Sequence, residues 1–167
     1  MKLITLIIIL ILLTNKSYAD KNMMIGEKGK ESDVDRIIKV NMYDNYFEPN
    51  FFTVKKGETI KFEIENLGDL VHEFNIANKK MHIQHQSEMM RMVENEILFS
   101  DFIDKEKMKK MAKIDKALAH SHSNSILLEP KEKMYLIWKF QKAKDIEIAC
   151  NVPGHYDTGM RAKVSLK

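Results

Sequence analysis

The fold assignment rests on residues 150–160, Cys150-Asn-Val-Pro-Gly-His155-Tyr-Asp-Thr-Gly-Met160. This segment holds a thiol, an imidazole and a thioether, which are soft or borderline ligands for transition metals. A glycine precedes both the histidine and the methionine, so the backbone has the freedom to turn sharply at each. The segment therefore predicts a tight loop that presents Cys150, His155 and Met160 to one metal ion.

Alternating apolar and polar residues predict strands on both sides of this loop. The clearest strand is 59–65, where Ile60, Phe62 and Ile64 alternate with charged residues, so that one face lies in a core and the other in water. Further strands are expected at 37–42, 51–54, 72–76, 134–140, 146–150 and 162–166. About seven strands of this kind favour an all-β fold, a β-sandwich.

A fourth ligand has to come from outside the loop, and His72 is the natural candidate. It begins a strand and shares its parity with Phe74 and Ile76, so its side chain points to the core side. Two histidines, one cysteine and a weak axial methionine are the ligands of a type 1 copper site. Zinc rarely uses thioether sulfur, and iron–sulfur clusters need more cysteines. The residues therefore predict one copper ion held by His72, Cys150, His155 and Met160.

The first residues predict export. Lys2 precedes an apolar run over 3–13, and Ser17-Tyr18-Ala19 supplies small residues for cleavage before Asp20. The run is too short to span a bilayer, although an uncleaved anchor is the alternative. We therefore expect a signal peptide at 1–19, a periplasmic protein and no membrane contact in the mature form. In an oxidising compartment the single cysteine has no internal disulfide partner, and a ligand role would protect it.

The mature chain suits one domain. Residues 20–34 are polar and lack periodicity, which predicts a flexible N-terminal segment before a domain at 35–167. Residues 79–124 break the strand pattern and are rich in Lys, Glu and Met, which predicts a helical insertion. Acidic and basic residues are interspersed and the formal net charge is only +3, so nucleic acid is not an expected partner. We expect a monomer.

Three segments resemble the cupredoxins: FEPNFFTVKKGETIKFEIENLG at 47–68, VHEFNI at 71–76 and WKFQKAKDIEIACNVPGHYDTGM at 138–160. The four-residue gaps from Cys to His and from His to Met are similar to those of rusticyanin. Plastocyanin has a shorter first gap, and azurin a shorter second gap. The histidine followed by an insertion with Met and His resembles the periplasmic blue or green cupredoxins of bacterial copper tolerance.

This resemblance implies a Greek-key β-sandwich with a helical insertion between the first His ligand and the Cys-His-Met loop. It assigns the ligand roles of one type 1 copper ion to His72, Cys150, His155 and Met160. It also implies that Asn151 and the backbone around Val71 support these ligands.

Two interpretations of the insertion remain open. His82, His85, Met89 and Met92 are spaced by three, four and three residues, so a helix would place them on one face. They form either a second, solvent-accessible site for copper(I) or an apolar face packed on the sandwich. His120 and His122 are expected in a solvated loop.

Two functions also remain open. One is one-electron transfer between redox partner proteins that the sequence does not identify. The other is copper tolerance, including storage or sequestration through a second Met/His site without a dedicated electron-transfer partner. No nucleophile motif or phosphate-binding glycine loop is present in the sequence, so an enzyme is not expected.

Overall fold

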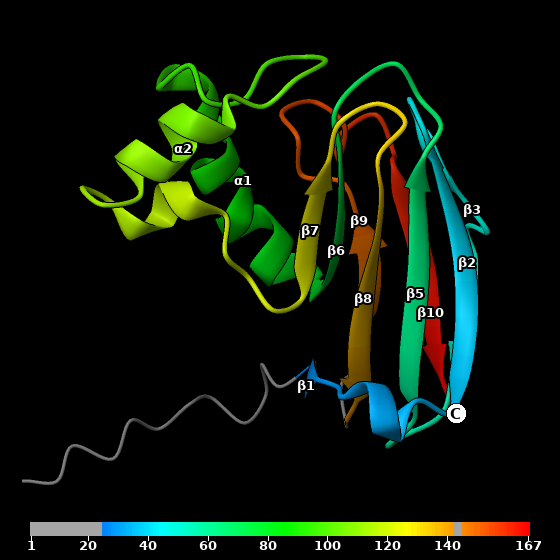
Figure 1. Cartoon of the computed structure of the whole chain (residues 1–167). Helices are drawn as coiled ribbons and strands as arrows, with labels where there is room; N and C mark the ends of the chain where they lie inside the picture. Colours follow the sequence, from blue (N-terminus) through cyan, green and yellow to red (C-terminus); the bar gives the residue numbers. More distant parts are fainter. Residues whose placement is uncertain (1–24, 142–144) are drawn as a thin grey trace, which may run out of the picture.

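The computed structural model describes residues 25–141 and 145–167. The predicted signal peptide 1–19 and the first part of the predicted segment 20–34 lie outside these residues. In the described part of the chain, the strands form two five-stranded sheets, and the helices lie together beside them (Figure 1). The predicted β-sandwich with a helical insertion is therefore confirmed. None of the described helices is long and apolar enough to cross a membrane.

One sheet carries the clearest sequence pattern. Its strands follow the order β1 (Gly26–Lys28), β8 (Lys133–Phe140), β5 (Thr59–Asn66), β2 (Arg36–Tyr43) and β3 (Tyr46–Glu48). The central strand β5 pairs antiparallel with β8 and parallel with β2. Ile60, Phe62 and Ile64 are fully buried in the core, as the alternation predicts.

The other sheet brings the ends of three strands together. Its strands follow the order β4 (Phe51–Val54), β10 (Arg161–Leu166), β9 (Ile146–Ala149), β6 (His72–Asn78) and β7 (Ser125–Leu128). β9 is antiparallel to both β6 and β10. The start of β6, the end of β9 and the start of β10 therefore lie at the same end of the sheet. The loop 150–160 lies at this end, at the top of Figure 1.

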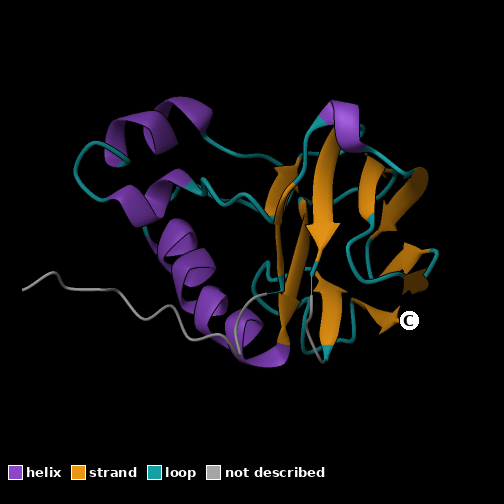
Figure 2. Cartoon of the chain, turned by 90° about the horizontal axis from the view of Figure 1, so that it is seen from below, coloured by secondary structure: helices purple, strands orange, loops and turns teal. Residues whose placement is uncertain are grey.

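The helical insertion runs between β6 and β7. It contains α1 (Lys79–Glu94), α2 (Lys105–Met111) and the 3-10 helix η3 (Lys116–Ala119). The side chains of Asn78 and Asp104 cap α1 and α2 by accepting hydrogen bonds from backbone N–H groups of the first turns. The helices stand beside one sheet of the sandwich (Figure 2) and α1 contacts β6 and β9. Both faces of β6 are buried as a result.

Three strands lie where the sequence does not predict them. β1 and the 3-10 helix η2 (Glu31–Asp33) occupy part of the segment predicted to be flexible, because Gly26 to Lys28 pair with the edge of β8 and Ile25 is buried. The short strands β3 and β7 each pair with one neighbour at a sheet edge. Segments this short carry little periodic signal of their own.

Candidate metal centre

The structure brings three of the four predicted ligands together, namely His72, Cys150 and His155. His72 begins β6, Cys150 directly follows β9, and Met160 directly precedes β10. His72 Nδ1 lies 3.2 Å from His155 Nδ1 and 4.0 Å from Cys150 Sγ, and Cys150 Sγ lies 3.3 Å from His155 Nδ1. Three candidate donor atoms therefore face one point, although the residues are up to 83 positions apart in the chain.

Backbone hydrogen bonds shape the loop. The Cys150 N–H donates to the Met160 carbonyl (3.2 Å), and the Met160 N–H donates to the His155 carbonyl (3.0 Å). Gly154 and Gly159 have φ of +90° and +96°, a region that disfavours any side chain. These bonds hold the two ends of the loop together, so the fully buried Met160 lies at the base of the loop beside Cys150.

The three facing atoms fit a copper ion. Two nitrogens and one sulfur placed about 2.0–2.3 Å from a common ion, in one plane, would lie about 3.5–3.8 Å apart. The observed separations of 3.2, 3.3 and 4.0 Å scatter around these values. A thiolate and two imidazoles, with the thioether that Met160 of the same loop offers, also form a donor set that copper accepts and that magnesium or calcium does not.

Burial sets the protonation of these donors. It raises the pKa of the Cys150 thiol to about 12, so the metal-free protein holds a neutral thiol at pH 7. It lowers the pKa of both His72 and His155, which favours neutral imidazoles with free lone pairs. A bound metal ion would therefore displace the thiol proton but would not have to displace a proton from either imidazole. The Glu73 N–H already donates a hydrogen bond to Cys150 Sγ (3.3 Å).

Asp44 is a further residue of the site that the sequence analysis missed. Its Oδ1 lies 3.1 Å from His72 Nε2, and it accepts hydrogen bonds from the N–H groups of Asp69 and Leu70. A carboxylate in this position fixes the orientation of the imidazole and leaves Nδ1 to face the other donors. Gly68 lies over this contact, since a Cβ there would overlap Asp44 and lie 2.9 Å from His72 Nε2. Asp44 belongs to the turn after β2, and no periodicity connects it with His72.

The residues expected to support the ligands lie close to them. The Asn151 side chain and backbone N–H both donate to Glu73 Oε2 (2.7 and 3.2 Å). The Val71 N–H donates to the carbonyl of Ser100 (2.7 Å), which lies in the insertion. The backbone beside His72 is therefore tied to the segment between α1 and α2.

Of the two interpretations of the insertion, the structure contradicts the solvent accessibility of the copper(I) site. His82, His85, Met89 and Met92 do lie on one face of α1, but this face is buried, and the two methionines belong to the hydrophobic core. His82 Nδ1 lies 3.1 Å from the Asn151 side chain instead. The second interpretation, a helix face packed on the sandwich, is correct for the methionines.

His120 is not solvated either, because its side chain is 5 % exposed and lies against Glu73. The sequence predicts a loop here, but it does not show that the loop folds back under α1. His122 lies at the edge of the same cluster, where its side chain is 35 % exposed.

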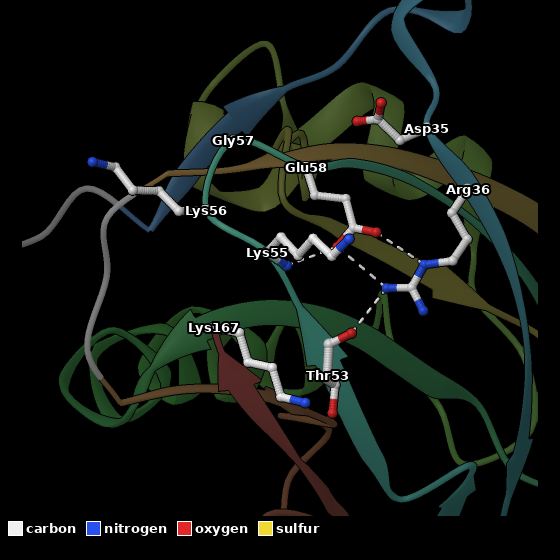
Figure 3. Close-up of a pocket in the computed structure, with 8 residues that line it drawn as sticks. All are labelled: Asp35, Arg36, Thr53, Lys55, Lys56, Gly57, Glu58 and Lys167. Carbon is white, nitrogen blue, oxygen red and sulfur yellow. Dashed lines mark hydrogen bonds and ion pairs between the residues drawn. The ribbon is translucent and has the colours of Figure 1, made fainter.

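A charged pocket lies at the other end of the sandwich, near the C-terminus, and Figure 3 shows its lining residues. Arg36 pairs with the Glu58 carboxylate (3.0 Å) and donates to the carbonyl of Thr53 (2.9 Å). The pocket is lined by the C-terminal residue Lys167, and Figure 1 shows the C-terminus at the bottom of the sandwich, opposite the loop 150–160 at the top. It therefore plays no part in the candidate metal centre.

Solved structures share the fold. Auracyanin B matches with a TM-score of 0.60 at 10 % identity, covering 87 % of this chain and 99 % of that chain. The dithionite-reduced auracyanin of Roseiflexus castenholzii matches with a TM-score of 0.55 at 16 % identity, covering 79 % of this chain and 96 % of that chain. At these identities the likeness shows the fold alone.

Sequence comparison identifies the family. The copper-resistant cuproprotein CopI of Pseudomonas aeruginosa is 34 % identical over 148 residues, which cover 85 % of this chain and 82 % of that protein. CopI of Rubrivivax gelatinosus is 26 % identical over 149 residues, which cover 89 % of this chain and 76 % of that protein. The family model of the cupredoxin-like domain matches residues 2–97, more than half of the chain, and ends before the loop 150–160. The chain belongs to the cupredoxin-like family.

Proposed function

We propose that this protein binds one type 1 copper ion through His72, Cys150, His155 and Met160 and acts in copper tolerance. The observation that carries the proposal is the convergence of His72 Nδ1, at the start of β6, with His155 Nδ1 and Cys150 Sγ of the loop 150–160. The copper-resistant cuproproteins that match most of the chain support the same function. The protein is on this account a binding protein rather than an enzyme.

Each residue has a defined task in this proposal. Cys150 supplies the strong sulfur donor as a thiolate, and the hydrogen bond from the Glu73 N–H stabilises its negative charge. The imidazoles of His72 and His155 would supply two nitrogen donors, and Asp44 orients the first of them. Met160 would supply a weak thioether donor. When bound, the copper ion supplies one-electron redox chemistry.

The fold keeps this donor set rigid. His72, Cys150 and Met160 lie at the ends of β6, β9 and β10, where β9 pairs with both other strands. His155 lies in the loop between Cys150 and Met160, which backbone hydrogen bonds close. A rigid frame limits rearrangement of the donors when the oxidation state of the ion changes. The same rigidity suits tight retention of copper.

We further propose that residues 1–19 are a signal peptide and that the mature protein works in the periplasm as a single domain. The charged residue Lys2, the apolar run 3–13 and the small residues before Asp20 support this assignment. Binding outside the cytoplasm would intercept copper before it enters the cell.

Survival of cells in copper tests the proposal. A strain lacking the gene should regain growth in copper when it expresses the wild-type chain, and should stay sensitive when it expresses Cys150→Ala. Met90→Ala is the matched control, since this side chain is 45 % exposed and lies on the insertion. Equal protein levels have to be verified by immunoblot. Full rescue by Cys150→Ala would exclude a role of the cysteine-based centre in copper tolerance.

A second candidate function is one-electron transfer, and one surface feature favours it. Phe99 and Phe102 are both exposed and stack with ring centroids 4.2 Å apart. They flank Ser100, whose carbonyl accepts a hydrogen bond from the Val71 N–H beside His72. An exposed apolar pair next to the centre would suit the docking of a redox partner.

Electron self-exchange between copper-loaded molecules tests this function. Phe99→Ser with Phe102→Ser should slow the exchange, whereas Ile114→Ser, a change at another exposed apolar residue, should leave it unchanged. Equal self-exchange rates in the wild type and both variants would show that the aromatic pair has no role in electron transfer.

A further inference from the structure

A second cluster of candidate ligands lies behind the first, around the carboxylate of Glu73. Glu73 follows His72 in β6, and its side chain points away from the sandwich core toward the insertion, where it is fully buried. Its Oε1 lies 2.8 Å from His85 Nε2, which belongs to α1, and 2.8 Å from His120 Nε2, which follows η3. The insertion therefore places two imidazoles beside a buried carboxylate oxygen of the sheet.

More groups converge on this oxygen than hydrogen bonding accounts for. Besides the two imidazoles, the Asn75 amide (3.1 Å) and the Ser125 hydroxyl contact Oε1. One carboxylate oxygen offers about two lone-pair sites, yet four groups point at it. The other oxygen, Oε2, is already held by the two N–H donors of Asn151. The carboxylate is thus fixed in orientation, and Oε1 is oversupplied with partners.

The spacing of the three donor atoms suits a metal ion. Two atoms placed about 2.0–2.1 Å from an ion and at right angles to each other lie about 2.8–3.0 Å apart. This value matches both 2.8 Å contacts of Glu73 Oε1. The nitrogens of His85 and His120 and the oxygen of Glu73 all lie within 4.8 Å of one another. Small shifts would admit an ion between them.

A second group continues this cluster toward the surface. His85 Nδ1 lies 3.0 Å from Glu88 Oε2, and the same oxygen lies 3.0 Å from His122 Nε2. The exposure of the side chains rises from 5 % at His120 and 9 % at His85 to about one third at Glu88 and His122 (34 % and 35 %). The outer group therefore connects the buried cluster with polar side chains that solvent reaches.

We propose that Glu73, His85 and His120 bind a divalent transition-metal ion, at a site separate from the cysteine-containing centre. One carboxylate and two imidazoles are an oxygen and nitrogen set without sulfur, which favours copper(II) or zinc(II) over copper(I). Copper(II) is expected to bind most tightly, since it stands above zinc in the general order of affinities. The inference does not depend on the proposed function, because no residue of this set is a ligand in the first centre.

The metal content of the full chain tests the proposal. With copper(II) salt as the probe, the wild type should bind two ions, and His120→Ala should bind one ion and keep an unchanged visible absorption band. The affinity for this ion should fall by at least about 10–100-fold, because removing a ligand costs no less than removing a residue that only supports one. The electron paramagnetic resonance signal of a copper(II) ion with nitrogen and oxygen ligands should be present in the wild type and absent from His120→Ala.

Two comparisons make the outcome decisive. His122→Ala is the matched control and should leave both ions bound, since this histidine belongs only to the outer group. A wild type and a His120→Ala variant with the same copper content would overturn the proposal, as would loss of an ion in His122→Ala alone. If the cysteine-containing centre does not bind copper, the result is different: the wild type lacks the visible absorption band, while His120→Ala still binds one ion fewer than the wild type.

A measurement on the wild type avoids the question of whether the variants fold. Crystals soaked in zinc(II) should show anomalous scattering at a position within bonding distance of Glu73, His85 and His120. A peak only between His85, Glu88 and His122, or no peak in this cluster, would overturn the proposal.

Discussion

Replacement of Glu73 by glutamine should strongly destabilise the metal-free protein. Although burial alone would raise the pKa of Glu73, the contacts with His120 and His85 hold this pKa well below its ordinary value, so the side chain is an anion at pH 7. A glutamine would have to turn its NH₂ group either toward the two N–H donors of Asn151 or toward the Asn75 amide and the imidazoles. At least one pair of donors would then face each other in a buried site.

The magnitude follows from the burial of the pair. Removing one partner of a buried ion pair costs about 3–5 kcal/mol, which is a large part of the about 5–15 kcal/mol that stabilises a typical domain. The unfolding free energy of a small protein falls by about 2 kcal/mol per molar urea, so Glu73→Gln should lower the urea concentration at the unfolding midpoint by about 1.5–2.5 M.

Glu88→Gln is the matched control, because Glu88 contacts the other nitrogen of the same His85 from a partly exposed position. Exposed ion pairs contribute about 0–1 kcal/mol, so its midpoint should shift by less than about 0.5 M. The assay is urea unfolding of both variants in the presence of a chelator, followed by circular dichroism. Equal shifts in the two variants, or a more stable Glu73→Gln protein, would refute the reasoning.

Three further predictions concern the insertion, the metal centre and pH. Met92→Ala should lower the unfolding free energy by about 2–5 kcal/mol, because this side chain is buried in the core. Met90 is exposed, so Met90→Ala should change the unfolding free energy by less than about 0.5 kcal/mol. Equal losses in urea unfolding would show that α1 does not pack on the sandwich as described. Asp44→Asn should lower copper affinity by about 10–100-fold in a chelator competition, since the carboxylate orients His72; an unchanged affinity would remove that role. Partial burial opposes ionisation of Glu129, but a lysine and a backbone N–H hold its pKa below the ordinary value. The ionised Glu129 therefore stabilises the fold above the ordinary glutamate pKa, and this stabilisation is lost as the pH falls below it. In urea unfolding at a series of pH values, the difference in unfolding free energy between wild type and Glu129→Gln should shrink on acidification. A difference that grows on acidification would contradict this sign.

The parts of the fold that the sequence predicts are those with local patterns. The alternation of Ile60, Phe62 and Ile64 places β5 correctly, because one face of that strand meets the core and the other meets water. The chemistry and spacing of the loop 150–160 identify a candidate metal centre directly. The parity of His72 gives its direction, but only the antiparallel pairing of β6 with β9 explains why it reaches the loop.

The parts that the sequence does not predict depend on contacts between distant segments. Glu73 alternates with buried residues and therefore reads as a solvent-facing position, yet the insertion covers it. The sequence indicates a solvated loop at His120, because its buried partner Glu73 is 47 positions away in the chain. Asp44 lies in a turn, where no periodicity indicates its contact with His72. Each of these residues owes its environment to tertiary packing.

The absorption spectrum of the copper-loaded protein tests the central claim most directly. Coordination of copper(II) by the Cys150 thiolate predicts an intense sulfur-to-copper band in the visible region, and this band should be absent from Cys150→Ala loaded under the same conditions. A wild-type protein that contains its full complement of copper(II) and remains colourless would contradict the account.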